Sequence, residues 1–215
     1  MSNNITLKLQ DIVLKGISTN NRALVLVSQG GKLILESGAK VTMNSNISTG
    51  YGGGIYVNGG ILELYIGCEI ENNIQNHAST PSGGGGIFIY NQGNVNMYGG
   101  LISGNKTGNG GGGINIYGNS SMTMSGGIIL NNVCQGGYWA RGGGIGIFDS
   151  GSSFTKHAIS GNNTSGIIYG GIGDNANIAN SGGHALYRDS GSKKLRNTTL
   201  GIYDEISTLS DVGWE

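Results

Sequence analysis

Four glutamates are the side chains in this sequence whose spacing could support acid–base chemistry. Glu63, Glu69 and Glu71 lie close together in the chain, and Glu36 lies about one repeat earlier. Polysaccharide lyases and glycoside hydrolases use paired carboxylates, or an acidic cluster that holds Ca²⁺ beside a basic residue. These glutamates are therefore the catalytic candidates, and a carbohydrate-active enzyme is one alternative for the function.

The neighbours of these glutamates favour a structural role instead. The chain is built of repeats, and Lys40 occupies the same position in one repeat as Glu69 does in the next. In a stacked structure the two side chains would be neighbours, so a surface ion pair explains much of the charge pattern. The next two repeats place Leu101 and Ile128 at that position, so no acidic cleft continues along the chain. We therefore expect the protein not to be an enzyme.

One short segment combines side chains that are typical of binding surfaces. Tyr138, Trp139 and Arg141 fall within four residues of one another. Tyrosine, tryptophan and arginine are enriched in contact hot spots, and aromatic rings stack on sugars. The alternative is that Trp139 folds back onto the coil, since tryptophan is often largely buried.

Further aromatic residues recur at equivalent positions of successive repeats. Tyr65 and Tyr98 occupy one outward column, and Tyr90, Tyr117 and Phe148 occupy another. Aligned rings could form a platform for a polysaccharide. We favour the alternative, an intramolecular ladder in which rings of neighbouring rungs stack on each other.

No metal or cofactor is expected. His77, His157 and His184 are far apart in the repeat, and no His/Cys spacing is typical of zinc. We expect His157 to lie in an inward column as a core histidine. Cys68 and Cys134 fall at different places in the repeat, so we expect two free or buried thiols and no disulfide.

Composition excludes several classes of protein. Charged residues make up 11% of the chain and the formal net charge is zero, so no basic stripe is available for nucleic acid. No segment reaches 18 apolar residues, so we expect no membrane span. The opening Met-Ser-Asn-Asn carries no apolar signal core, which predicts either a cytosolic protein or a fragment of a longer exported one.

One unit recurs along the chain. Three glycines followed by isoleucine mark its start at residues 52–55, 84–87, 111–114 and 142–145. An apolar residue followed three positions later by asparagine marks its end: Val41 with Asn44, Ile70 with Asn73, Ile102 with Asn105, Ile129 with Asn132 and Ile159 with Asn162. The first glycine precedes this asparagine by 21, 21, 21 and 20 residues, whereas the segment after it varies. A fixed rung with insertions at one corner indicates a solenoid.

Apolar residues alternate with period two in short runs, which predicts strands with one buried face. With no room for a helix, three strands and three turns would make a triangular rung. The sequence therefore predicts an all-β protein, a right-handed parallel β-helix of about five full coils plus partial terminal coils. Expected apolar columns are Ile55-Ile87-Ile114-Ile145, Val57-Ile89-Ile116-Ile147 and Val41-Ile70-Ile102-Ile129-Ile159. The five asparagines should stack as an amide ladder.

We expect a single β-helix domain over 1–215. Its parts are a partial first coil (5–20), five repeat coils (22–162), a long loop insertion (163–181), and a degenerate last coil with a C-terminal cap (182–215). The insertion could be an extra partial coil or a lid over its neighbours, and 202–215 should fold over the final edge. The variable corner comprises loops 45–51, 74–83, 106–110, 133–141 and 163–181. Loops on a rigid scaffold are the natural place for function.

The triple-glycine motif and the Ile-Ser-Gly-Asn motifs at 102–105 and 159–162 resemble the repeats of polymorphic outer-membrane proteins and related bacterial surface proteins. The resemblance is greatest to the variant in large surface proteins of spirochaetes and gut anaerobes. It implies an extracellular location and suggests that the chain is a fragment of a longer exported protein.

The leading hypothesis is a non-enzymatic, adhesin-like surface module that presents loops to a host or bacterial glycan or protein. A bare structural stalk is the remaining alternative. An exposed first rung would also allow copies of the chain to associate end to end.

Overall fold

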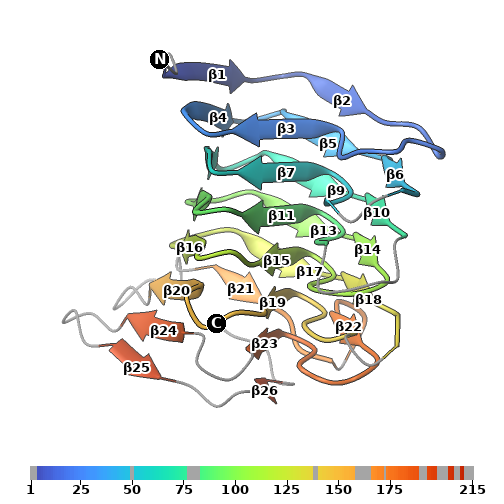
Figure 1. The fold of residues 1–215 in the computed structure, drawn as a ribbon, viewed down its shortest axis with the longest axis vertical. Helices are drawn as coiled ribbons and strands as arrows, with labels where there is room; N and C mark the ends of the chain where they lie inside the picture. Colours follow the sequence, from blue (N-terminus) through green and yellow to red (C-terminus); the bar gives the residue numbers. More distant parts are fainter. Residues whose placement is uncertain are drawn as a thin grey trace.

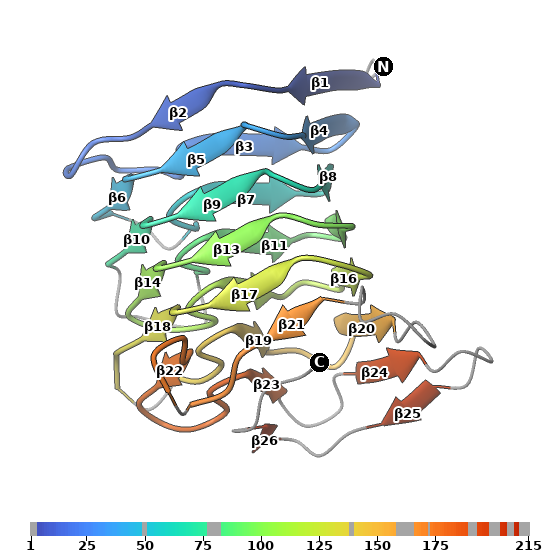
Figure 2. The same cartoon turned by 180° about the vertical axis from the view of Figure 1, so that it is seen from behind.

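The computed structural model describes residues 4–48, 51–76, 83–137, 140–157, 166–171 and 173–188, together with the backbone of 193–197, 203–205 and 209–210. The chain winds as a right-handed parallel β-helix of about five turns, which confirms the predicted fold class (Figures 1 and 2). Four sheets run along the helix axis, and successive coils stack on one another within each sheet.

Each sheet collects one strand from every coil. Sheet A contains β1 (Ile5–Leu9), β4 (Gly31–Leu35), β8 (Ile61–Leu64), β12 (Asn94–Met97), β16 (Ser121–Met124), β20 (Ser153–His157), β24 (Lys193–Asn197) and β25 (Tyr203–Glu205). Sheet B contains β2 (Val13–Lys15), β5 (Lys40–Thr42), β9 (Glu69–Glu71), β13 (Leu101–Ser103), β17 (Ile128–Leu130) and β21 (Ile167–Ile168). Sheet C contains β6 (Ser45–Asn46), β10 (Ile74–Gln75), β14 (Lys106–Thr107), β18 (Val133–Cys134) and β22 (Ile178–Ala179). Sheet D contains β3 (Val25–Ser28), β7 (Ile55–Asn58), β11 (Ile87–Tyr90), β15 (Ile114–Ile116), β19 (Ile145–Ile147), β23 (Leu186–Arg188) and β26 (Leu209–Ser210).

The rung has four strands, so the expected triangle of three strands was wrong. Each coil passes through sheets D, A, B and C in turn, as β7, β8, β9 and β10 do. The fourth strand is two residues long and begins directly after the ladder asparagine. It lies at the start of segments that sequence patterns assign to loops. Two residues are too few to show an alternating pattern, so this strand could not be predicted.

The apolar columns fill the centre of the coil. Two columns, begun by Ile55 and Val57, follow the predicted order in the strand register and are fully buried. The third column follows the prediction from Val41 to Ile129 and then continues to Ile168. Ile159, its expected last member, lies outside the described residues.

The buried asparagines form the predicted ladder. The Asn73 backbone N–H donates to Oδ1 of Asn105 at 3.0 Å, and the Asn105 backbone N–H donates to Oδ1 of Asn132 at 3.1 Å. Each side-chain amide also donates to a carbonyl of the preceding coil, for example from Asn105 to Ile70 at 2.9 Å. The ladder therefore holds neighbouring coils in a fixed register.

The last member of the ladder is Asn177 rather than the expected Asn162. The Asn132 side-chain amide donates to Oδ1 of Asn177 at 3.0 Å. The segment 163–181 contains β21 and β22, which pair with β17 and β18, so its described part continues the coil and is not a loop or a lid. The alternative of an extra partial coil is therefore the correct one. Asn162 lies outside the described residues. At the other end, Asn20 extends the ladder by donating to Asn44 at 2.9 Å.

The third glycine of each triplet makes room for this ladder. A Cβ at Gly86 would lie 3.0 Å from Cγ of Asn105, and one at Gly113 would lie 3.1 Å from Cγ of Asn132. Both approaches are tighter than ordinary van der Waals contact. The third glycine is thus required by close packing against the asparagine.

His157 is not the expected core histidine. The alternation in β20 turns Phe154 and Lys156 inward, where they follow Met122 and Met124 of the preceding rung. His157 is consequently left half-buried on the outer side. The apolar Phe154 sets the phase of this strand, and Lys156 enters the fully buried column as a result.

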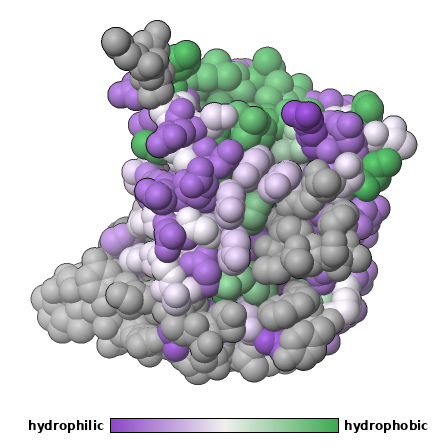
Figure 3. Space-filling model, in the orientation of Figure 1, coloured by the Kyte–Doolittle hydropathy of each residue, from purple (hydrophilic) through white to green (hydrophobic). Residues whose placement is uncertain are grey.

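The two ends of the β-helix differ. At the C-terminal end, β25 pairs antiparallel with β24 and β26 pairs antiparallel with β23, so the backbone of 203–205 and 209–210 covers the edges of sheets A and D. At the N-terminal end, β1 and β2 are the outermost strands of sheets A and B. Apolar side chains gather on the surface at this end (Figure 3).

Both cysteines are free and buried, as their places in the repeat predict. Burial raises the pKa of the Cys68 thiol to about 11 and that of the Cys134 thiol to about 12. The reactive thiolate is therefore scarce at neutral pH.

We expect Asn105→Ala to lower the free energy of unfolding by about 3 kcal/mol, because it leaves buried polar groups of two neighbouring coils unpaired at about 1–3 kcal/mol each. Chemical denaturation followed by circular dichroism measures the effect. Asn96→Ala is the matched control, since it removes a part-buried bond to Asn94 on the outer side of β12, and it should cost less than about 1 kcal/mol. Equal losses would contradict a special role for the ladder.

We expect neither thiol of the folded protein to react with iodoacetamide at mildly alkaline pH, because burial restricts access and raises both pKa values. Both should react after unfolding in guanidinium chloride, and intact mass spectrometry counts the adducts. Rapid labelling of Cys68 or Cys134 without denaturant would show that the coil around that residue opens.

Candidate functional site

All four candidate glutamates form ion pairs with lysines. The ion pairs join Lys8 to Glu36 at 2.8 Å, Lys32 to Glu63 at 2.7 Å, and Lys40 to Glu69 at 2.5 Å and Glu71 at 3.1 Å. Hydrogen bonding to Glu69, and then to Glu71, raises the pKa of Lys40 above its usual value. The expected pair between Lys40 and Glu69 is confirmed, and this face is a ladder of surface ion pairs.

The predicted binding segment is only partly within the described structure. Tyr138 and Trp139 lie outside the described residues. The Arg141 guanidinium donates a hydrogen bond of 2.7 Å to the Tyr187 hydroxyl and lies 5.0 Å from the centre of that ring. Arg141 therefore helps to tie the last described rung of sheet D to the preceding corner.

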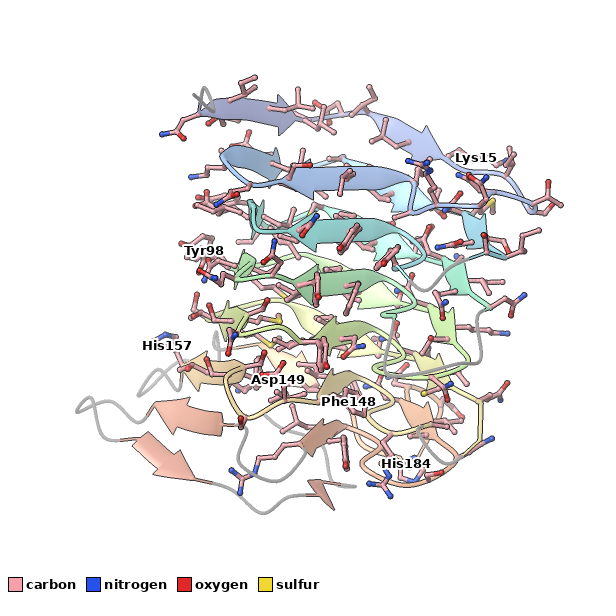
Figure 4. The ribbon with its side chains drawn as sticks, viewed as in Figure 1. Lys15, Tyr98, Phe148, Asp149, His157 and His184 are labelled. Carbon is pink, nitrogen blue, oxygen red and sulfur yellow. The ribbon has the colours of Figure 1, made fainter. Side chains whose placement is uncertain are left out.

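Phe148 holds the expected place in the Tyr90 column, because it follows Ile147, which pairs with Ile116. Its ring, however, joins the same cluster as Arg141. Its ring packs on Tyr187, with the ring centres 5.1 Å apart. Phe148 is buried, because Gly146 leaves space for the ring to fold back over sheet D. Figure 4 shows it beside β19, near Asp149.

An aromatic row runs along the outer side of sheet D. It contains Tyr51, Tyr56, Phe88, Tyr90 and Tyr117, and neighbouring ring centres lie 5.1, 5.5, 5.7 and 5.9 Å apart with interplanar angles of 20° or less. The stacking of Tyr90 on Tyr117 supports the favoured interpretation of an intramolecular ladder. The first three rings were missed by sequence reasoning, although two of them occupy the position after the Gly-Gly-Gly-Ile motif.

The row is most exposed at the Tyr51 end. Phe88, in its middle, is 2% exposed, whereas Tyr51 is 49% exposed. Tyr56 lies between them, and burial raises its pKa to about 12. A ligand can therefore reach the Tyr51 end of the row but cannot lie along its full length.

A pocket of about 480 Å³ opens beside this end. It is lined by Asn21, Arg22, Ala23, Leu24, Leu26, Ser48, Tyr51 and Tyr56. Two rings and aliphatic side chains supply apolar walls, while amide, hydroxyl and guanidinium groups supply polar contacts. This combination is typical of small-molecule and sugar sites, in which a few polar groups orient a ligand against apolar surface.

The polar side of the pocket is held by two buried asparagines. The Asn44 side-chain amide donates to the Arg22 carbonyl at 2.9 Å, and the Ser48 backbone N–H donates to Oδ1 of Asn46 at 3.2 Å. Within the described part of the chain, the Arg22 guanidinium has no carboxylate partner. Arg22 was also missed by sequence reasoning.

A second surface lies at the corner between sheets A and B. Tyr65 and Tyr98 stack there as expected, with ring centres 5.1 Å apart and planes tilted by 35°. Figure 4 labels Tyr98 on the outer edge of the coil. Beside it lies a shallow groove of about 750 Å³, whose base is formed by glycines of successive rungs. The groove has few polar groups, so it offers less specificity than the Tyr51 pocket.

The two histidines that the structure describes lie apart. Nδ1 of His184 accepts a hydrogen bond of 3.1 Å from the Ala179 backbone N–H. His157 and His184 lie at opposite sides of the coil in Figure 4, and His77 is outside the described residues. No group of three potential metal ligands occurs among the residues that the structure describes.

Comparison with known protein families, with curated proteins and with solved structures gave no match. Within the described ranges, no helix has the length and hydrophobicity needed to cross a membrane.

Proposed function

We propose that the protein is a non-enzymatic binding module that uses the β-helix as a rigid support and binds a glycan in the pocket between Arg22 and Tyr51. The observation that carries this proposal is the junction of an exposed aromatic row with a pocket that contains polar side chains. The apolar face of a sugar ring stacks on tyrosine, and its hydroxyls bond to amide and hydroxyl groups such as those of Asn21 and Ser48.

Arg22 narrows the class of glycan. Its planar guanidinium can bind a carboxylate through two parallel hydrogen bonds, which an ammonium group cannot reproduce. Since the described ion pairs leave this group without a carboxylate, an acidic sugar is the ligand that would supply one. The ligand class is thus a glycan with a uronic or similar acidic residue.

The proposed location is the bacterial cell surface or the extracellular space, where the chain would act as an adhesin-like module. Its support is the triple-glycine and asparagine punctuation that resembles bacterial surface repeats. The partners would be host or bacterial glycans or proteins. Tyr138 and Trp139 remain candidates for a further contact at the variable corner.

We expect Tyr51→Ala to weaken binding to an acidic oligosaccharide about tenfold, because ring stacking contributes about 0.5–1.5 kcal/mol and about 1.4 kcal/mol corresponds to a factor of ten. Arg22→Gln should weaken acidic ligands more than neutral ones. A glycan array followed by isothermal titration measures both effects.

Tyr65→Ala is the control, because Tyr65 is another exposed tyrosine and lies at a different corner of the coil. The proposal is contradicted if the wild type binds a glycan and this binding is unchanged in Tyr51→Ala, Arg22→Gln and Trp139→Ala. Absence of binding across a broad panel would favour the stalk.

The alternative of a polysaccharide lyase or glycoside hydrolase has its own test. The carboxylates are held in ion pairs with lysines, so we expect no release of unsaturated or reducing ends from acidic polysaccharides. Chromatography and absorbance detect these products. If the wild type forms such products and Glu69→Gln or Glu63→Gln does not, the protein is a carbohydrate-active enzyme instead.

A further inference from the structure

The N-terminal end of the β-helix leaves both core and backbone uncovered. Leu7 occupies the same inward column as Leu33 of the next rung, yet it is 53% exposed whereas Leu33 is 2% exposed. Ile5, on the same face of β1, is 66% exposed. The apolar surface at this end in Figure 3 is therefore the open end of the core. Open strand edges of this kind readily pair with another strand.

The hydrogen bonds of β1 show which backbone groups face the open edge. The Ile5 N–H donates to Gly30 at 3.2 Å, and the Leu9 carbonyl accepts from Glu36 at 2.9 Å. Because the direction of the backbone N–H and C=O groups alternates along a strand, those of Leu7 also point toward β4.

Thr6 and Lys8 consequently direct their N–H and C=O groups away from β4. No strand lies on that side of β1 in the described part of the chain. The edge thus offers two donors and two acceptors in a regular array.

We propose that two copies of the chain associate head to head through β1, around a twofold axis at Leu7. Twofold symmetry makes the two β1 strands antiparallel. Thr6 then lies opposite Lys8 of the second copy, and the two pairs exchange four backbone hydrogen bonds. Leu7 faces Leu7 of the second copy as a non-hydrogen-bonded pair, where side chains approach most closely.

The charges favour this register over its neighbour. Centring the pair on Lys8 would place two ammonium groups directly opposite each other, which is destabilising. Centring it on Leu7 places Lys8 beside Thr6 and lets it keep its 2.8 Å ion pair with Glu36. All five residues of β1 find a partner, with Ile5 opposite Leu9 of the second copy.

The other end explains why the partner is a second N-terminal end and why the assembly stops at two. The antiparallel strands β25 and β26 interrupt the parallel ladder at the C-terminal end, so that end does not offer the continuation that head-to-tail stacking needs. An isologous contact between N-terminal ends is closed by its own symmetry.

Sedimentation and light scattering across a wide range of concentrations test this proposal. The wild type should pass from monomer to dimer, and Leu7→Glu should remain monomeric because two carboxylates would meet at the axis. Ile66→Glu is the matched control, since Ile66 is 80% exposed on a different rung, and it should dimerise normally. Circular dichroism establishes that each variant is folded.

Mixing Leu7→Glu with Leu7→Lys should restore a dimer that contains one copy of each, because residue 7 faces itself across the axis. Should Leu7→Glu fail to fold, Thr6→Pro removes one edge N–H that the coil itself does not use and should also prevent dimerisation. The proposal is overturned by a wild type that stays monomeric, by open-ended assemblies, or by a mixture that does not restore the dimer.

Discussion

The buried asparagine ladder is the interaction on which the remaining structure depends. Each amide bonds to the next asparagine and to a carbonyl of the preceding coil, so a coil that slipped by one residue would leave several buried polar groups unpaired. The spacing from glycine to asparagine is therefore nearly constant in the coils up to Asn132. The third glycine is fixed by the same requirement, since a side chain there would collide with the amide. Length varies after the asparagine, where this constraint ends.

The central coils could be predicted from the sequence because one pattern specifies both the strand and the register. Period-two alternation predicts the inward residues, and the repeated asparagine shows which coils align. The fifth coil could not be predicted in this way. A local Ile-Ser-Gly-Asn motif suggested Asn162, but membership of the ladder is decided by pairing with Asn132, which Asn177 provides. His157 was misplaced for a related reason, because the phase of its strand follows Phe154 and the column beneath it.

The candidate site was harder to predict than the fold. Arg141 and Phe148 were selected for residue type, but both pack against Tyr187, a contact between distant parts of the chain. Arg22 and Tyr51 were missed because they meet only when two corners of successive coils stack. Sequence spacing gives the column of an outward ring but does not tell whether neighbouring rungs bury it, as they bury Phe88, or leave it open, as they leave Tyr51.

The pocket and the open edge lie at the same end of the molecule, and this placement connects the two proposals. Leu24 and Leu26 line the pocket, and Leu26 belongs to β3, the outermost strand of sheet D. A twofold axis through β1 brings the β3 edge of one copy over the β2 edge of the other, because β3 and β2 flank β1 on opposite sides of the rung. Two pockets would then lie close to one interface and move as a rigid pair. A glycan chain long enough to span them would bind with a high effective concentration for its second site, so modest affinity at each pocket suffices for adhesion.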